Sequence, residues 1–522
     1  MIDGQPLVGT ETVVVGGGFG GLSTACYLAD AGADVTLLEQ NERLGGAANL
    51  IEDEGFRFDT GPSWYLMPDV FERFFGHFDR DPEGYYDLVE LDPQYRVFFD
   101  DEQPAGAGEA PGDHGEYIDV IDREQVRQVF AAYEDGGGEA FDEYLAEAER
   151  TYEVGMEHFV YEDRSRFRDM LDLDVLKCGP GLTFLGSMQE HVEEYVGSHR
   201  LQQLLQYTLV FLGGAPHNTP ALYNLMAHVD YNLGVYYPEG GIHSVVEGIA
   251  EMGRELGVEY RTETPVTAIA DRPEGVRVAT PDREYRPDAV VANANPAHVE
   301  GELLPEADRD KGVDYWADRT YAPSALMFYL GVEGDVDPLK HHTLVFPEDW
   351  DPHFERIFDE PAWPEDPAYY ISVTSKTDDS VAPDGHHAVV ILVPIAPGLD
   401  DGPEIREEYR EKVLSHLAET AGVDLRDRIV VSHSACVSEF AERFNYPEGS
   451  ALGLAHTLRQ TGPLRPSHRS GSVDGLYYAG SYVEPGIGMP MTLISGEHAA
   501  EAVVEDRTSG GVRSLLPTGA DD

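Results

Sequence analysis

The chain is long and strongly acidic: its 522 residues carry 36 basic and 97 acidic side chains, a net charge of −61 at pH 7. This charge excludes nucleic acid as a partner, because phosphates would be repelled, and three scattered cysteines exclude a disulfide framework. The acids are dispersed along the chain, which predicts a surface adapted to a high-salt cytoplasm rather than one functional acidic face.

The first predicted unit, residues 12–39, is a β-branched strand, a glycine cluster, a helix, a second strand and an acid. In such a unit Gly16 permits a sharp turn, Gly18 the approach of a pyrophosphate, and Gly21 close packing of the helix on the strand. Glu39 stands where it could accept a hydrogen bond from a ribose hydroxyl. Because the helix N-terminus also presents N–H groups to phosphates, the unit predicts dinucleotide binding rather than a plain βαβ turn.

A second glycine pair, Gly45-Gly46, follows soon after Glu39, with Arg43 in front of it. This arrangement resembles the two-glycine-pair signature of FAD-binding oxidoreductases of the amine-oxidase superfamily. An NAD site has no need of the second pair, so the resemblance implies FAD.

From residue 56 to 235 the pattern passes from short strands to helices. Two uncharged features have two interpretations each. The tract 201–212 is either core packing or the lining of a hydrophobic substrate site or membrane-facing entrance. Trp64 and Tyr65 are either core or substrate-tunnel residues. The predicted elements are strands at 88–91 and 95–99, a helix with Pro68 in its first turn, a surface excursion at 101–116 and mostly helix over 123–230.

The second half predicts a return to the dinucleotide unit and a second sheet. Strands are expected at 258–261 and 289–294, with helices at 242–256 and 404–420. The long apolar runs 322–332 and 389–396 predict strands of the second sheet. A glycine-proline loop after Gly480 then precedes a helix over 492–504, whose N-terminus can face a polarised ring or ribityl chain.

Taken together, residues 10–505 resemble the carotenoid desaturases of the bacterial and archaeal phytoene-desaturase type. The segments that carry this resemblance are 16–21, 39–46, 56–68, 168–171, 237–241, 293–295, 341–342, 380–385 and 485–496. The resemblance implies, with the acidity, a haloarchaeal source. It also implies FAD contacts at Gly16, Gly18, Gly21, Glu39, Arg43, Gly46, Gly61, Val266, Gly480 and Met489. Related flavoenzymes often carry Asp after the last glycine of this set, where this chain has Ser481.

The fold class that follows is α/β, with a Rossmann-like FAD-binding domain, a mixed-sheet substrate domain and a helical, membrane-associating subdomain. The FAD-binding domain is expected in three parts, 1–100, 236–300 and 441–505. The remaining divisions are a helical substrate region at 101–235, a substrate-binding sheet domain at 301–440 and a flexible acidic tail at 506–522.

Desaturation removes a hydride and a proton from adjacent carbons; the flavin takes the hydride, and a general base assists with the proton. In the family an acid in a Phe-Arg-Asp-Met stretch is considered for this work, and Asp169 matches it, although Asp172 stands where some members carry Arg. Asp169 is therefore the predicted base, with a surface or capping acid as the alternative. Neighbouring His341 and His342 should point to opposite faces of a strand, so no metal site is predicted.

The predicted function is an FAD-dependent desaturase that converts phytoene to lycopene and passes electrons to a quinone or oxygen. The alternatives are a later 3,4-desaturase, a carotenoid isomerase or saturase, and, from another class, a non-catalytic isoprenoid-binding protein. Residues 1–10 lack a basic region and an apolar run of signal-peptide length, and no window is long enough to span a bilayer. The expected location is the cytoplasm, with peripheral attachment to a membrane surface.

Overall fold

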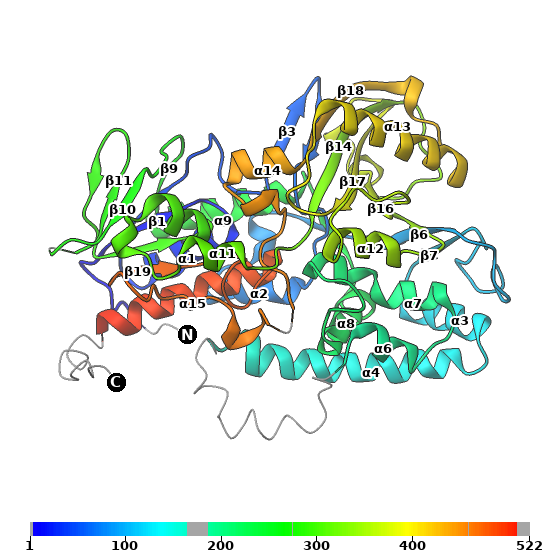
Figure 1. Cartoon of the computed structure of the whole chain (residues 1–522), viewed down its shortest axis with the longest axis horizontal. Helices are drawn as coiled ribbons and strands as arrows, with labels where there is room; N and C mark the ends of the chain where they lie inside the picture. The colour runs from blue at the N-terminus through cyan, green and yellow to red at the C-terminus, as the bar shows by residue number, and fades with distance from the viewer. Residues whose placement is uncertain (1–3, 164–185, 274, 458, 509–522) are drawn as a thin grey trace.

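The computed structural model describes residues 4–163, 186–273, 275–457 and 459–508. A parallel sheet and its helices occupy one end of the molecule, and a larger mixed sheet occupies the other (Figure 1). A group of helices lies below the mixed sheet in this view. The site described below lies where these three parts meet.

The parallel sheet has five strands that come from three distant parts of the chain. Val13 and Val14 are buried, as a parallel strand covered on both faces requires. Its order is β19-β13-β1-β2-β9, from β1 (Glu11–Val15), β2 (Asp34–Leu38), β9 (Glu259–Arg261), β13 (Ala289–Ala292) and β19 (Leu476–Tyr478). Helix α1 (Phe19–Asp30) packs on α9 (Ile242–Leu256) and α15 (Met489–Thr508). The expected strands at 258–261 and 289–294 are confirmed.

The mixed sheet has seven strands in the order β18-β14-β17-β16-β15-β6-β7. Its two longest strands, β14 and β17, are the long strands that the sequence predicts, and they pair antiparallel; β15 and β6 form its parallel pair. Helix α13 (Pro403–Thr420) packs Leu414 and Leu417 into the apolar core of this sheet. The strands are β6 (Tyr95–Asp100), β7 (Tyr117–Val120), β14 (Ser324–Glu333), β15 (His342–Pro347), β16 (Tyr369–Ser372), β17 (His386–Ile395) and β18 (Ile429–Ala435).

The predicted helical region is confirmed as α3 (Arg123–Tyr133), α4 (Gly137–Gly155), α6 (Met188–Glu193), α7 (His199–Gln206) and α8 (Leu225–Tyr231). The tract 201–212 contributes residues both to the core and to a cavity lining. Leu201 and Leu204 are core residues, whereas Tyr207 and Leu212, in the 3-10 turn Tyr207–Leu212, line the cavity described below.

The predicted excursion at 101–116 is anchored rather than loose. Arg200, which is almost fully buried, pairs with Asp101 and donates a hydrogen bond of 2.6 Å to the carbonyl oxygen of Gly115. One buried cation therefore ties both ends of the excursion to α7.

Within the described ranges no helix is both long and apolar enough to cross a bilayer.

Smaller elements complete the structure. Pro68 occupies the first turn of α2, as predicted. The domain divisions stay a prediction; α15 continues past residue 506, and 509–522 lie outside the described residues. These elements are β3 (Leu50–Asp53), β4 (Phe56–Asp59), α2 (Pro68–His77), β5 (Leu88–Glu90), β8 (Tyr236–Pro238), β10 (Ala268–Ala270), β11 (Arg277–Ala279), β12 (Glu284–Tyr285), α12 (Asp351–Phe358) and α14 (Val437–Phe444).

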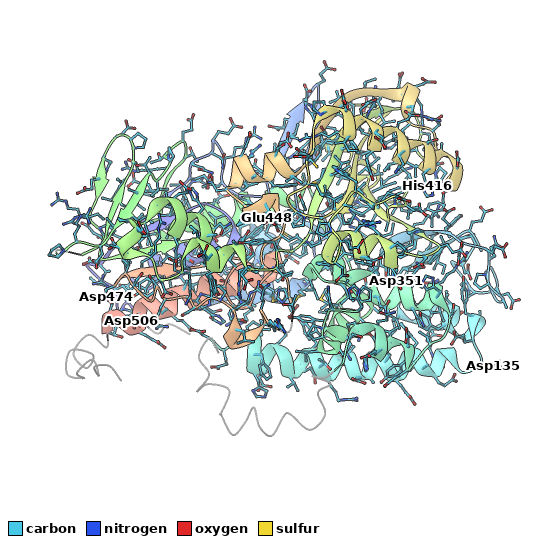
Figure 2. All side chains as sticks on the ribbon, in the orientation of Figure 1. Asp135, Asp351, His416, Glu448, Asp474 and Asp506 are labelled. Atoms are coloured by element: carbon cyan, nitrogen blue, oxygen red, sulfur yellow. The ribbon has the colours of Figure 1, made fainter. Side chains whose placement is uncertain are left out.

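Acidic side chains lie far apart on the molecule. Asp474 and Asp506 are at one end and Asp135 is at the other (Figure 2). Such a distribution agrees with a surface suited to high salt, where ions screen the repulsion between carboxylates.

Candidate active site

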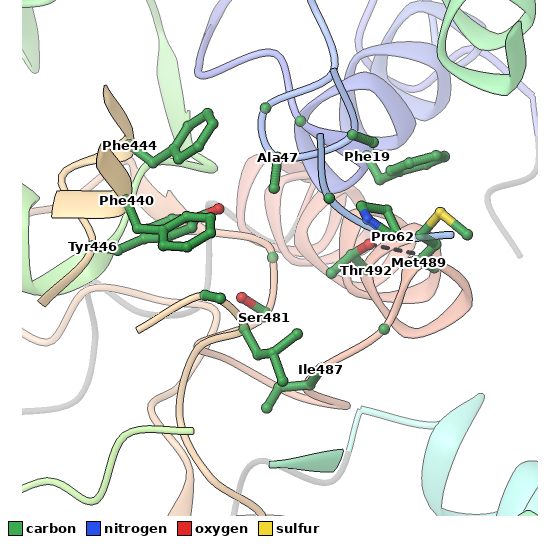
Figure 3. Close-up of a pocket in the computed structure, with 18 of the residues that line it drawn as sticks. Phe19, Ala47, Pro62, Phe440, Phe444, Tyr446, Ser481, Ile487, Met489 and Thr492 are labelled. Carbon is green, nitrogen blue, oxygen red and sulfur yellow. Dashed lines mark hydrogen bonds between the residues drawn. The ribbon is translucent and has the colours of Figure 1, made fainter. Parts of the chain in front are cut away.

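A cavity of about 470 Å³ runs from the glycine-rich end of the parallel sheet to the mixed sheet. In Figure 3, Phe19, Pro62 and Met489 lie together on one side of it, and Phe440, Phe444 and Tyr446 lie on the opposite side. The cavity has a cradle at the turn after β1 and an apolar chamber that extends toward the helical region.

The cradle is built from glycines, several of which leave no room for a Cβ atom. A Cβ on Gly21 would stand 2.0 Å from the carbonyl oxygen of Gly16, so α1 begins directly against the end of β1. Gly16 has φ +99° and turns the chain there. Gly18 caps α1 without a side-chain hydrogen bond, and the first turn holds no acid. The partial positive charge at this helix end is therefore open to an anion.

The second glycine pair packs directly on the first. The N–H of Gly45 donates to the carbonyl oxygen of Gly17 at 2.7 Å, and a Cβ on Gly46 would stand 3.3 Å from the Cα of Gly18. A larger residue at Gly46 would have to shift the Gly18 backbone by a few tenths of an ångström, which is a physical reason for glycine in both loops.

Glu39 is 4% exposed and closes the cradle at the end of β2. Its Oε2 accepts a hydrogen bond of 2.7 Å from the N–H of Gly17, and its Oε1 accepts one of 2.8 Å from the N–H of Asn41. The carboxylate thus organises the glycine turn and lines the cavity at the same time.

We expect Glu39→Gln to weaken FAD binding by about tenfold, or about 1.4 kcal/mol, because an amide has one acceptor oxygen for two backbone donors. Titration of the apoprotein with FAD measures this. Glu42→Gln, an exposed acid of the same loop, is the matched control and should bind as the wild type does. Equal affinity of both variants would contradict the assigned role.

The C-terminal loop forms another wall of the cradle. Gly480 has φ +105°, and its N–H donates to Ser495 Oγ at 2.9 Å, which fixes the end of β19 on α15. Ser481 and Ile487 face the cavity (Figure 3), and α15 begins beside it at Met489.

The apolar chamber is the part of the cavity away from the cradle. The Trp64 ring lines it and stacks on His342 with 4.2 Å between ring centroids, whereas Tyr65 packs in the core against Phe71. Trp64 therefore belongs to the core and also lines the cavity, whereas Tyr65 is a core residue. The chamber is lined by Trp64, Tyr207, Val210, Met226, Val229, Leu344, Phe346, Trp350, Phe354, Ile357, Tyr370 and Leu392.

Most polar side chains of the chamber already form hydrogen bonds within the protein. His353 donates to the carbonyl oxygen of Pro394 at 2.7 Å and accepts from the N–H of Ala368 at 3.0 Å, and burial lowers its pKa to about 4. Tyr370 pairs with His342, whose pKa burial also holds far below its usual range. Both imidazoles are therefore neutral at physiological pH.

One buried acid stands directly behind the chamber. Asp230 in α8 is 2% exposed, and its two oxygens accept hydrogen bonds from the hydroxyls of Tyr95 (2.8 Å) and Tyr207 (2.9 Å). Burial raises its pKa to about 7. Asp230 was not among the residues predicted from the sequence; the available signal was a single acid inside the apolar tract from Ala221 to Tyr231.

The structure places most predicted site residues together. Two differ: Gly21 packs under the cradle, and the Arg43 side chain pairs with Glu52 at the surface at 2.9 Å. Asp169 lies outside the described residues. His341 and His342 do not point apart as expected, because His341 precedes β15 and its ring lies 4.6 Å from that of His342. The predicted contacts that line the cavity are Gly16, Gly18, Glu39, Gly46, Gly61, Val266, Gly480 and Met489.

The cradle fits FAD. It offers an uncapped helix N-terminus for a pyrophosphate, a carboxylate at the end of β2 for a ribose, and an extended lining that continues to the C-terminal loop. A model of the flavin-containing amine oxidoreductase family matches residues 19–504. The chain therefore belongs to the flavin-containing amine oxidoreductase family, and FAD is its cofactor.

Two relatives identify the family to which the chain belongs among these flavoenzymes, and one solved structure shares its fold. The carotenoid 3,4-desaturase of Haloarcula japonica is 61% identical over 96% of this chain and 99% of its own length. The zeta-carotene-forming phytoene desaturase of Myxococcus xanthus is 32% identical over 98% and 96%. An oxidoreductase from Methanosarcina mazei shares the fold, with a TM-score of 0.58, 16% identity and coverage of 94% and 100%. The chain belongs to the carotenoid desaturase family within these flavoenzymes. The predicted family, cofactor and enzyme class are confirmed.

Proposed function

We propose that this protein introduces a double bond between C3 and C4, near the end of a long carotenoid chain. The observation that carries the proposal is the 61% identity with a carotenoid 3,4-desaturase over nearly the whole of both chains. Conversion of phytoene to lycopene, the first expectation, becomes the second candidate, because the zeta-carotene-forming phytoene desaturase of Myxococcus xanthus is only 32% identical to this chain.

The residues of the chamber would align the substrate and keep water away. Trp64, Phe346 and Phe354 offer flat apolar surfaces to a polyene, and the chamber opens directly into the cradle. Bound FAD supplies the hydride acceptor. What the chain contributes is the orientation of the C–H bond and a dry environment, which prevents competing reactions with water.

The test uses the FAD-loaded protein in high salt with lycopene or phytoene in vesicles. We expect lycopene to gain conjugation, seen as a shift of its absorption to longer wavelength, while phytoene stays unchanged. Phytoene consumed in preference to lycopene would favour the second candidate. Val229→Trp adds bulk to the apolar chamber, and this control variant should retain FAD while losing turnover.

We also propose that the enzyme takes its substrate from a membrane surface, because a carotenoid dissolves in lipid and not in water. A quinone or oxygen is the proposed electron acceptor, and omitting each in turn from the same assay identifies it.

Asp169 stays the proposed general base. Asp169→Asn should slow turnover and leave FAD binding unchanged.

A further inference from the structure

Arg465 is a buried cation directly behind the cofactor cradle. It is 4% exposed, and its guanidinium donates to the carbonyl oxygens of Leu454 at 2.9 Å, Gln460 at 3.0 Å and Ser481 at 2.8 Å. Ser481 lines the cavity, so one peptide group separates the positive charge from the cavity wall. Burial lowers the pKa of Arg465, but a guanidinium keeps its proton at any physiological pH.

The guanidinium donates no hydrogen bond to a carboxylate among the described residues. The three partners of the guanidinium are main-chain oxygens, and its Nε has no partner among the described residues. Glu484 is the acid that acts on Arg465 electrostatically, and its own Oε1 lacks a partner among the same residues. Arg465 thus differs from a structural arginine whose charge is offset by a hydrogen-bonded carboxylate.

Glu484 does not cancel the charge at neutral pH. It is nearly fully buried, and burial raises its pKa to about 8, against smaller effects of Arg465, Asp163 and the N–H of Gly462. The other groups that face Arg465 are His456, Tyr223 and Tyr482. His456 is neutral because burial lowers its pKa well below its usual range, and burial raises the pKa of both tyrosines. Below about pH 8 the cluster therefore carries a net positive charge.

We propose that Arg465 is a positioning residue that raises the reduction potential of the bound FAD, by holding an uncancelled positive charge against the Ser481 carbonyl at the cradle wall. Reduction by hydride transfer adds one hydrogen nucleus and two electrons to the flavin, so the cofactor becomes more negative unless it also takes up a proton. A fixed cation in a low-dielectric interior favours that charge. The inference depends on FAD in this cradle and not on which carotenoid is the substrate.

The test is a potentiometric titration of the FAD-loaded enzyme against a reference dye, without carotenoid. Arg465→Gln should lower the potential, and Arg465→Lys should restore most of it, because lysine keeps the charge and loses the forked hydrogen bonds. Arg469→Gln removes an equal charge that is already paired with Asp506 and Glu505, so its potential should match the wild type. Equal potentials in the wild type and all three variants would overturn the proposal. So would an equally lowered potential in Arg465→Gln and Arg465→Lys.

A second measurement leaves Arg465 intact, in case its variants lose FAD. Glu484→Gln removes the ionisation while keeping the size of the side chain. The wild-type potential should fall more steeply with rising pH through about pH 8 than that of Glu484→Gln, because only the wild type gains a neutralising carboxylate there. Parallel pH profiles would contradict the proposal. Failure to desaturate lycopene would not, since that result concerns the proposed function alone.

Discussion

Gly21→Ala is expected to abolish FAD binding, with an affinity at least about 100-fold weaker, or about 3 kcal/mol. The added Cβ would stand 2.0 Å from the carbonyl oxygen of Gly16 and 3.1 Å from the Cβ of Asn293. Both neighbours are held in place, one by the end of β1 and the other beside the end of β13, so α1 must move. A shift of α1 displaces Gly18 and the helix N-terminus from the pyrophosphate position.

Gly76→Ala is the matched control for this substitution. Gly76 lies in α2, and a Cβ there would meet nothing within 4 Å. Flavin absorbance after gel filtration, with circular dichroism to confirm folding, measures both variants. A folded Gly21→Ala protein with full flavin content would show that the contact between α1 and β1 does not position the cofactor.

The cradle could be predicted from sequence because its determinants are local. A β-branched strand, glycines with a required conformation and an acid at the end of the next strand act within 30 residues, and each leaves its own signal between Thr12 and Glu39. The long strands β14 and β17 were equally accessible, because unbroken apolar runs are typical of strands buried on both faces.

The chamber could not be predicted to the same depth, because it is assembled from distant segments. Tyr207, Phe346 and Asp230 come close only through the packing of helices under the mixed sheet, and no local spacing encodes that contact. Arg43 shows a second limit: its position in the sequence suggests the cofactor, and only the structure shows that its side chain pairs with Glu52 at the surface. Arg465 likewise gives no sign in the sequence that it reaches the Ser481 carbonyl.

Asp230→Asn is expected to make the folded protein more stable than the wild type, by an amount that grows as the pH rises to about 7. Burial raises the pKa of Asp230 from 3.8 to about 7 in the folded state. Between these values the unfolded chain releases the proton and the folded chain keeps it, so the folded state binds more protons. The wild type therefore loses stability as pH rises through this range, and the loss is complete above about pH 7.

The asparagine has no proton to lose and can keep hydrogen bonds with Tyr95 and Tyr207. The stability of the Asp230→Asn protein therefore does not fall in this way as the pH rises. At about 1.4 kcal/mol for each pH unit, the difference between the two proteins should change by up to about 4 kcal/mol over the whole range. Urea unfolding at constant high KCl, from about pH 4 to about pH 8, measures it as a shift in midpoint. Asp135→Asn removes an exposed acid at the edge of the molecule (Figure 2) and should follow the wild-type curve. A constant difference between Asp230→Asn and the wild type at every pH would mean that Asp230 is already ionised in the folded enzyme, with Tyr95 and Tyr207 compensating its burial.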